Sequence, residues 1–313
     1  MLPEILRRLM ATIPVMGVVA IAVFGLLHFT PGDPAVIIAG DYATSEDIAR
    51  IRTKLGLDRP FLSQVGIWVG QVARGDLGTS IFSGLPVSTL IGQRVGATFS
   101  LTLLAMLISV GLGVPLGIIA AWKQGSLIDR LVMIFAVSGF SMPVFWLGFL
   151  LVYVFAISAA WLPVQGYQPL SAGVWPYLRH LILPALTLSL VYMALIARMT
   201  RASMLGVLRA DYIRTAFAKG LAPGGVLVRH ALKNASLPVV TIIGIGFALL
   251  IGGAVVTESV FAIPGLGRLT VDAIVRRDYP VIQGVILIVS GVYVLINLVI
   301  DVLYVVLDPR IRY

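Results

Sequence analysis

Cysteine is missing from this chain of 313 residues, and charged side chains make up only 12% of it. Without cysteine there is no disulfide bond, no thiolate metal ligand and no cysteine nucleophile. The histidines, His28, His180 and His230, are far apart, and no HExxH pattern is present, so they indicate no metal site. A GxxxxGK[ST] phosphate-binding loop is missing too. The sequence therefore predicts no nucleotide site and no cofactor on this chain.

Apolar residues dominate instead. They make up 59% of the chain, and the mean hydropathy is +1.01, which is typical of a protein whose main solvent is lipid. Six apolar runs are long enough, or nearly so, to cross a hydrocarbon core of about 30 Å as helices. They cover approximately residues 9–29, 97–121, 131–158, 181–197, 237–257 and 281–307. We therefore expect an all-α membrane protein with six transmembrane helices.

The first apolar run follows two arginines and could be read as a signal peptide. It is long for the hydrophobic region of such a peptide, and residues 27–31 contain no small-x-small cleavage site. We expect an uncleaved first helix.

Lysine and arginine are concentrated in segments that would share one side of the membrane with the N-terminus. The largest of these segments, 198–236, carries Arg198, Arg201, Arg209, Arg214, Lys219, Arg229 and Lys233. The short segments of the opposite side carry Arg179, Arg268, Arg276 and Arg277. Because basic short loops mark the cytoplasmic side, both termini are predicted to be cytoplasmic. Anionic lipid would attract this face, so the pI of about 10.1 requires no nucleic-acid partner.

The segment 30–95 is too long to be a simple loop. Thr44 and Asp47 have the spacing of a helix capping box, and the apolar residues between Phe61 and Val72 recur with a helical period. We expect an extracytoplasmic helical segment here, which could pack over the bundle or touch a soluble partner. The chain is thus divided into a tail with a first helix (1–29), this segment (30–95) and a five-helix core (96–313).

The basic inner loop 198–236 is patterned as two helical stretches separated by residues 221–225. Asp211 is placed to favour the N-terminus of the first helix, and Gly220 is placed to end it in a left-handed conformation. Ala216 and Phe217 share a face of this helix, while Arg214 and Lys219 lie around the other. A short helix with small residues and one aromatic side chain suits insertion into a cleft on another protein.

Two strings in this loop, DYIRTAFAKGL at 211–221 and RHALKNA at 229–235, carry a family resemblance. They are similar to the inner loop of permease subunits of binding-protein-dependent ABC importers, in the dipeptide, oligopeptide and nickel group. Of that family's general Glu-Ala-Ala, Gly and Ile-x-Leu-Pro pattern, only Ala216, Gly220 and Leu232 match. Arg214 and Lys233 depart from it. Further similar segments are 31–34, 55–58, 75–78, 183–185, 261–267, 278–280 and 308–310.

The resemblance implies a type I ABC importer permease fold in a bacterial inner membrane, and a transport subunit rather than an enzyme. The implied partners are a second homologous permease, two cytoplasmic ATPases that bind ATP and Mg, and an extracytoplasmic substrate-binding protein. The inner loop would supply a coupling helix that fits a groove on an ATPase. Its expected residues are Asp211, Tyr212, Arg214, Thr215, Ala216, Phe217, Lys219 and Gly220. Short peptides are the expected substrate, with nickel chelates or another small solute as the alternative.

Polar residues inside the apolar runs give further expectations. One face of the last run carries Gln283, Ser290, Tyr293, Asn297 and Asp301. Such a face should line the bundle or a wet pathway. Asp301 could pair with an inner arginine or take part in the pathway. Met142–Pro143 should interrupt the third helix, and Glu258 should anchor the outer end of the fifth.

Two other classes of function compete with an ATP-driven importer subunit. A self-sufficient, ion-coupled transporter is disfavoured because the six runs show no evident internal repeat. An intramembrane enzyme is disfavoured because no two carboxylates and no Ser/His pair share a helix face.

Overall fold

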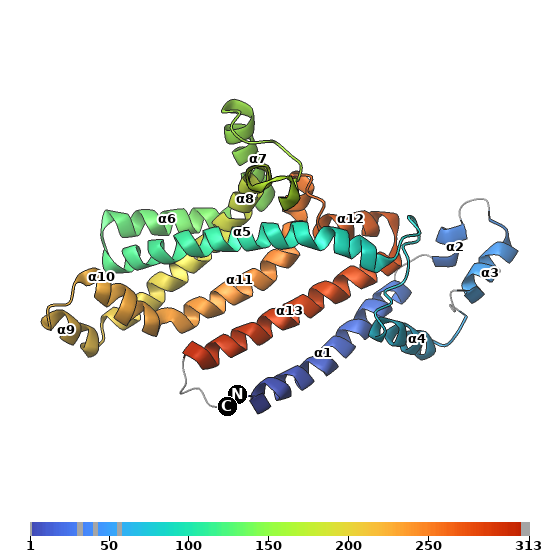
Figure 1. Ribbon diagram of the computed structural model, residues 1–313, viewed down its shortest axis with the longest axis horizontal. Coiled ribbons are helices and arrows are strands. Elements are labelled where there is room, and N and C mark those ends of the chain that lie inside the picture. The colour runs from blue at the N-terminus through green and yellow to red at the C-terminus, as the bar shows by residue number, and fades with distance from the viewer. Residues whose placement is uncertain (1, 30–33, 40–42, 55–57, 308–313) are drawn as a thin grey trace. The chain divides into compact units, whose positions relative to one another are not determined.

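The computed structural model describes residues 2–29, 34–39, 43–54 and 58–307 (Figure 1). In these ranges the regular structure is helical, apart from one antiparallel bridge between Thr79 and Pro86. The parts of the predicted features at 31–33, 55–57 and 308–310 lie outside the described residues. The chain forms two compact units, one of Met1–Arg94 with Leu269–Val294 and one of Val95–Arg268 with Leu295–Tyr313.

The second unit is a bundle organised around one long helix, α8. Its main helices are α5 (Val87–Trp122), α6 (Leu127–Ser141), α7 (Val144–Leu151), α8 (Val174–Leu208) and α11 (Lys233–Val260). Helix α8 packs against α6, α7 and α11. Leu101, Leu181, Ile196 and Leu250 lie in the buried cluster that joins these helices.

Helix α5 reaches α8 through two glycines four residues apart. A Cβ on Gly113 would lie 2.9 Å from the carbonyl oxygen of Met193, and one on Gly117 would lie 2.6 Å from that of Ala197. The two backbones therefore approach as closely as a small-xxx-small pattern permits. Neither position tolerates a side chain without separating the helices.

The predicted interruption at Met142–Pro143 is present, and it is larger than a kink. Helix α6 ends at Ser141, α7 begins at Val144, and the segment bends by 108°. Met142 takes an extended conformation with ψ of 133°, as expected of a residue that precedes proline. Helix α7 continues into a π-helix, η1 (Val152–Ser158).

Five of the six predicted spans each lie within one helix, and the third, 131–158, is broken at Met142–Pro143. The structure supports fewer crossings. Among the described residues, four helices are long and apolar enough to cross a membrane, or five if the bent pair counts as one span. The helix of the first run, α1 (Leu2–Phe29), contributes a shorter apolar stretch, Met10–Gly25. Six spans therefore remain a prediction.

The first unit contains the two helices predicted for the segment 30–95, α3 (Ser45–Lys54) and α4 (Phe61–Ala73). It also contains a short helix that the sequence did not predict, α2 (Pro34–Ala39). The capping box is confirmed, because the Thr44 hydroxyl donates to Asp47 Oδ2 at 2.6 Å and accepts from the Asp47 amide at 3.3 Å. These hydrogen bonds from Thr44 hold the pKa of Asp47 below its ordinary value. Helix α4 packs on α1, where Phe24 meets Phe61 and Trp68 with ring centroids 5.8 and 5.6 Å apart.

Residues 75–86 of the first unit dock on the start of α13 (Tyr279–Leu307). The Ser80 hydroxyl donates to Asp278 Oδ2 at 2.5 Å, and the Ile81 amide donates to Asp278 Oδ1 at 3.1 Å. Gly78, which has a φ of +82°, lies against Pro280. Two of the segments that carry the family resemblance, 75–78 and 278–280, thus meet in space.

Glu258 is the anchor that the sequence predicts, and it is fully buried. Its carboxylate accepts from the Thr98 hydroxyl at 2.5 Å and from the Arg268 amide at 3.0 Å. The same Thr98 hydroxyl accepts from the Leu266 amide at 2.8 Å. This network ties the N-terminus of α12 (Leu266–Arg276) to α5 and α11. A Cβ on Gly265 would overlap the Glu258 carboxylate.

We predict that Gly265→Ala destabilises the protein by about 1–3 kcal/mol, because the added methyl group must displace a hydrogen-bonded, buried carboxylate. The thermal unfolding midpoint of detergent-purified protein measures the effect. Gly252→Ala on α11 is the matched control, since a Cβ at Gly252 meets no atom within 4 Å. Equal midpoints for the two variants would contradict the assignment of the carboxylate network.

Candidate functional site

The predicted inner loop forms a helical excursion between α8 and α11. Helix α9 (Asp211–Ala218) is followed by one short turn, α10 (Pro223–Gly225), and a π-helix, η3 (Val226–Leu232). Figure 1 shows α9 and α10 together at one end of α8 and α11. Helix α9 packs against η3.

Local chemistry defines the ends of α9 as the sequence predicts. Asp211 lies in the first turn, where an acid complements the helix dipole. At the other end, Gly220 has a φ of +78°, and its amide donates to the Phe217 carbonyl at 2.9 Å. The Leu221 amide donates to the Ala216 carbonyl at 3.3 Å. Gly220 therefore terminates the helix in the left-handed conformation that favours glycine.

The apolar face of α9 is turned toward the chain's own core. Ile213 and Ala216 are buried, and Phe217 is half-buried, stacked on Trp122 with centroids 5.8 Å apart and ring planes inclined by 29°. The sequence and the family resemblance predict that Ala216 and Phe217 face a partner ATPase. Their spacing places them on one face, but spacing alone does not say what that face meets. A part in coupling remains a prediction for both.

The opposite face of α9 is exposed and mostly polar or charged. Its exposed side chains are Asp211, Tyr212, Arg214, Thr215 and Ala218, and the exposed Lys219 follows the helix. Arg214 lies 3.8 Å from Asp211 in an ion pair that is almost wholly exposed, so it contributes little to stability. Thr215 donates its hydroxyl hydrogen to the Asp211 carbonyl at 3.0 Å. This face is the surface of α9 that another molecule can reach.

Beneath α9 lies a second buried cluster, separate from that of the bundle. It joins α5, α8, α9, η3 and α11 through small and aliphatic side chains. Its buried members are Ala121, Met204, Ile213, Ala216, Val226, Ala231 and Ala235. Alanine at four of these positions lets the helices come close together.

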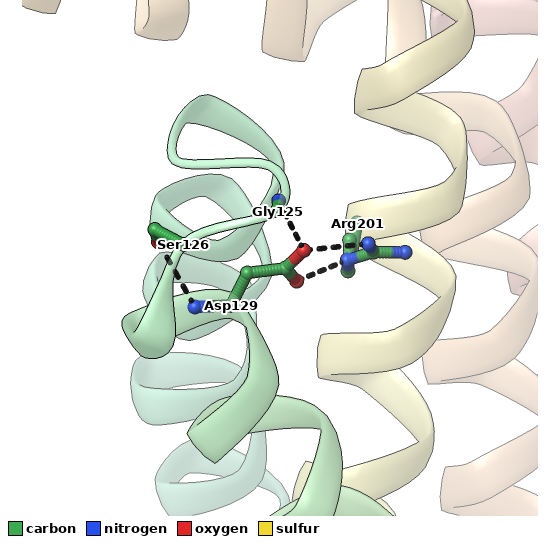
Figure 2. Close-up of polar contacts among 4 residues, drawn as sticks. All are labelled: Gly125, Ser126, Asp129 and Arg201. Atoms are coloured by element: carbon green, nitrogen blue, oxygen red, sulfur yellow. Dashed lines mark hydrogen bonds and ion pairs between the residues drawn. The ribbon is translucent and has the colours of Figure 1, made fainter.

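An ion pair joins the first turn of α6 to α8 (Figure 2). The Arg201 guanidinium donates from Nε to Asp129 Oδ1 at 2.6 Å and from Nη2 to Oδ2 at 2.8 Å. The Gly125 amide donates to the same Oδ2 at 2.9 Å, and the Asp129 amide donates to the Ser126 hydroxyl at 3.4 Å. The side chains of Arg201 and Asp129 are 24% and 6% exposed. A bidentate, largely buried pair of this kind is geometrically specific.

The sequence places Arg201 in the basic segment 198–236 and indicates no partner for it, whereas in the structure Arg201 lies within α8 and pairs with Asp129. Ser126 and Asp129 show the same spacing as the capping box at Thr44 and Asp47, so the start of α6 could have been predicted. The pairing with Arg201, which is 72 residues away in the sequence, has no local signal.

The polar residues of the last run are not alike in their surroundings. Gln283 is buried, Ser290, Asn297 and Asp301 are half-buried, and Tyr293 is 45% exposed. One turn beyond Asp301, the Tyr304 hydroxyl donates to Thr241 Oγ1 on α11 at 2.6 Å. The contact attaches this part of α13 to the bundle. Both interpretations of Asp301 remain predictions.

Within the described ranges, no group of three or more His, Asp or Glu side chains is placed to hold a metal ion. The ring of His180 lies 2.7 Å, measured from Nδ1, from the Pro176 carbonyl oxygen of its own helix. The side chain of His28 lies outside the described residues.

Comparison with known proteins identifies relatives over the whole chain. Residues 113–313 match the family described as binding-protein-dependent transport system inner membrane component, and residues 1–102 match its N-terminal family. A probable peptide ABC transporter permease of Sinorhizobium fredii is 54% identical, covering 99% of both chains. A glutathione transport system permease of Escherichia coli is 46% identical over the full length of both. A dipeptide transport system permease of Alkalihalophilus pseudofirmus is 44% identical, also over both full lengths.

Among solved structures, the chain resembles the inward-facing MetNI methionine ABC transporter with a TM-score of 0.59. The match covers 71% of this chain and 97% of that one, at 18% sequence identity. It shows a shared fold.

We predict that Asp129→Asn lowers the stability of the protein by up to about 3 kcal/mol, because it leaves a largely buried guanidinium without its counter-charge. The thermal unfolding midpoint in detergent reports the loss. Asp47→Asn is the matched control, since Asp47 has the same capping position on a solvent-exposed helix. The loss of stability in Asp47→Asn should be well below that in Asp129→Asn. The double variant Asp129→Arg with Arg201→Asp, which exchanges the two charges, should recover part of the lost stability. An unfolding midpoint of the double variant no higher than that of Asp129→Asn would count against the ion pair.

Proposed function

The chain belongs to the family of binding-protein-dependent transport system inner membrane components, and we propose that it is the permease subunit of an ATP-driven importer of short peptides. It is a multi-pass protein of the bacterial inner membrane and a transport subunit rather than an enzyme. The relatives named above are described as permeases for peptides, dipeptides and glutathione. Since glutathione is itself a short peptide, these names agree on one substrate class.

The rest of the importer lies on other polypeptides. We propose two cytoplasmic ATPases that bind ATP and Mg, a second homologous permease that completes the pathway, and an extracytoplasmic binding protein that delivers the substrate. Family membership supports the ATPases and the binding protein. The fold shared with MetNI and the basic inner segments support a type I permease with six spans and both termini in the cytoplasm.

One observation supports coupling through α9: its one face is held by the chain's own core and its other face is open. Tyr212, Arg214, Thr215 and Lys219 on the open face would enter the ATPase groove. Their charge and hydrogen-bonding groups would set orientation and association rate more than affinity. Ile213, Ala216 and Phe217 would contribute from the buried side by fixing α9 on the bundle.

The alternatives differ in what they require. A permease for nickel chelates or another small solute would have the same subunits and a different binding protein. The ligand retained by the co-purifying binding protein therefore separates it from a peptide permease. A self-sufficient transporter would need no ATPase at all.

We predict that proteoliposomes holding the chain with its partner subunits import peptide only when ATP is supplied on the ATPase side. The chain alone should bind no ATP and should import nothing in an ion gradient. Gradient-driven uptake by the isolated chain would refute the importer-subunit assignment.

We predict that Gly220→Pro abolishes ATP-driven import, because proline fixes φ near −65° and removes the amide that donates to Phe217. Gly220→Ala should impair import less, through the strain of a side chain in the left-handed region. Peptide uptake and the recovery of ATPase subunits in pull-down experiments measure the effect. Gly224→Ala serves as control, since its Cβ meets open space, and normal import by Gly220→Pro would contradict the coupling role of α9.

A further inference from the structure

In the proposed function an ATPase moves α9, and this movement must reach the membrane helices. This helix has eight residues and is joined to α8 by Arg209 and Ala210 and to α10 by residues 219–222. Ala210 is extended, with ψ of 146°, and Gly220 is left-handed. Two such non-helical joints do not transmit force as a continuous helix does. Contacts between side chains must therefore connect α9 to the spans.

One contact links α9 to the end of α5. Phe217 stacks on Trp122, the last residue of α5. Ile213 and Ala216, on the same face of α9, are buried beside Ala121. The stack thus lies at the edge of a closely packed cluster, and a displacement of α9 pushes directly on α5.

The second contact links the turn after α5 to both α6 and α8. Asp129 lies in the first turn of α6. Its carboxylate accepts hydrogen bonds from the Gly125 amide, in the turn between α5 and α6, and from the Arg201 guanidinium of α8. Gly125 is three residues beyond Trp122, so the ion pair and the stack act on the same short turn. Arg201 lies seven residues before the end of α8 at Leu208, about two helical turns away.

We propose that the Phe217–Trp122 stack and the Asp129–Arg201 ion pair are positioning contacts that make α9 and the inner ends of α5, α6 and α8 move as one body. The inference rests on the proposed function, in which an ATPase moves α9. These four side chains act through the helices that they join. Their task is to pass the displacement to three spans at once instead of letting the joints of α9 absorb it.

The measurement that isolates this role is the amount of peptide imported per ATP hydrolysed by the reconstituted importer. A residue needed only for folding lowers the amount of assembled complex, and both rates fall together. A positioning contact leaves ATP hydrolysis in place and lowers import. We expect Phe217→Ala and Asp129→Ala to reduce the ratio by about fivefold or more, the range of typical coupling between sites. Trp122→Phe, which preserves a stack, should retain the ratio.

Because the chain has no cysteine, the stack can be replaced by a covalent link. The double variant Trp122→Cys with Phe217→Cys should hydrolyse ATP with poor import. A short bis-methanethiosulfonate cross-linker should then restore import, since the two helices need no relative movement. The controls are the two single-cysteine variants, each assembled with cysteine-free partner subunits and treated with the same reagent.

Two results would overturn the proposal: normal coupling in the unlinked double variant, or import that stops on cross-linking and resumes after reduction. The second would mean that α9 must move against α5 in each cycle. Failure of the proposed function is distinguishable, because the wild-type importer would then show no ATP-driven import at all.

Discussion

The close approach of α5 and α8 is the constraint on which the packing around α9 depends. In lipid, association between helices gains little from the hydrophobic effect, so it relies on tight packing and hydrogen bonds. Gly113 and Gly117 permit that packing by leaving α5 without side chains where it meets the α8 backbone. With α5 seated there, Trp122 at its end is in place to meet Phe217, and the following turn is in place to bring Asp129 to Arg201.

This arrangement divides the labour between the two faces of α9. Its buried face is committed to the chain itself, through Ile213, Ala216 and Phe217. Its open face carries charge and hydroxyl groups that are exposed to solvent. The same helix thus has one packed face and one exposed face, and in the proposed function the exposed face is the one that meets the ATPase.

Local features of the fold could be predicted from the sequence because their causes lie within a few residues. The capping box at Thr44 and Asp47, the stop at Gly220 and the break at Pro143 are of this kind. The family resemblance extended the prediction to the whole chain. What spacing could not decide was the surroundings of a face, as with Phe217, or a partner distant in sequence, as with Arg201. The four-residue spacing of Gly113 and Gly117 is visible in the sequence, but the sequence does not show which helix packs against these glycines.

The break at Pro143 has a consequence for how the protein meets its solvent. Helix α6 has 15 residues and rises about 22 Å, less than the roughly 30 Å of hydrocarbon. A helix of this length that starts at one surface of a membrane would end inside the hydrocarbon, where the carbonyls of its last turn cannot bond to water. The Ser141 hydroxyl donates to the Val137 carbonyl at 2.8 Å, which is one turn before the last carbonyls of the helix. Those last carbonyls need protein or an inlet of water beside them, so lipid tails are not a sufficient neighbour for this side of the bundle.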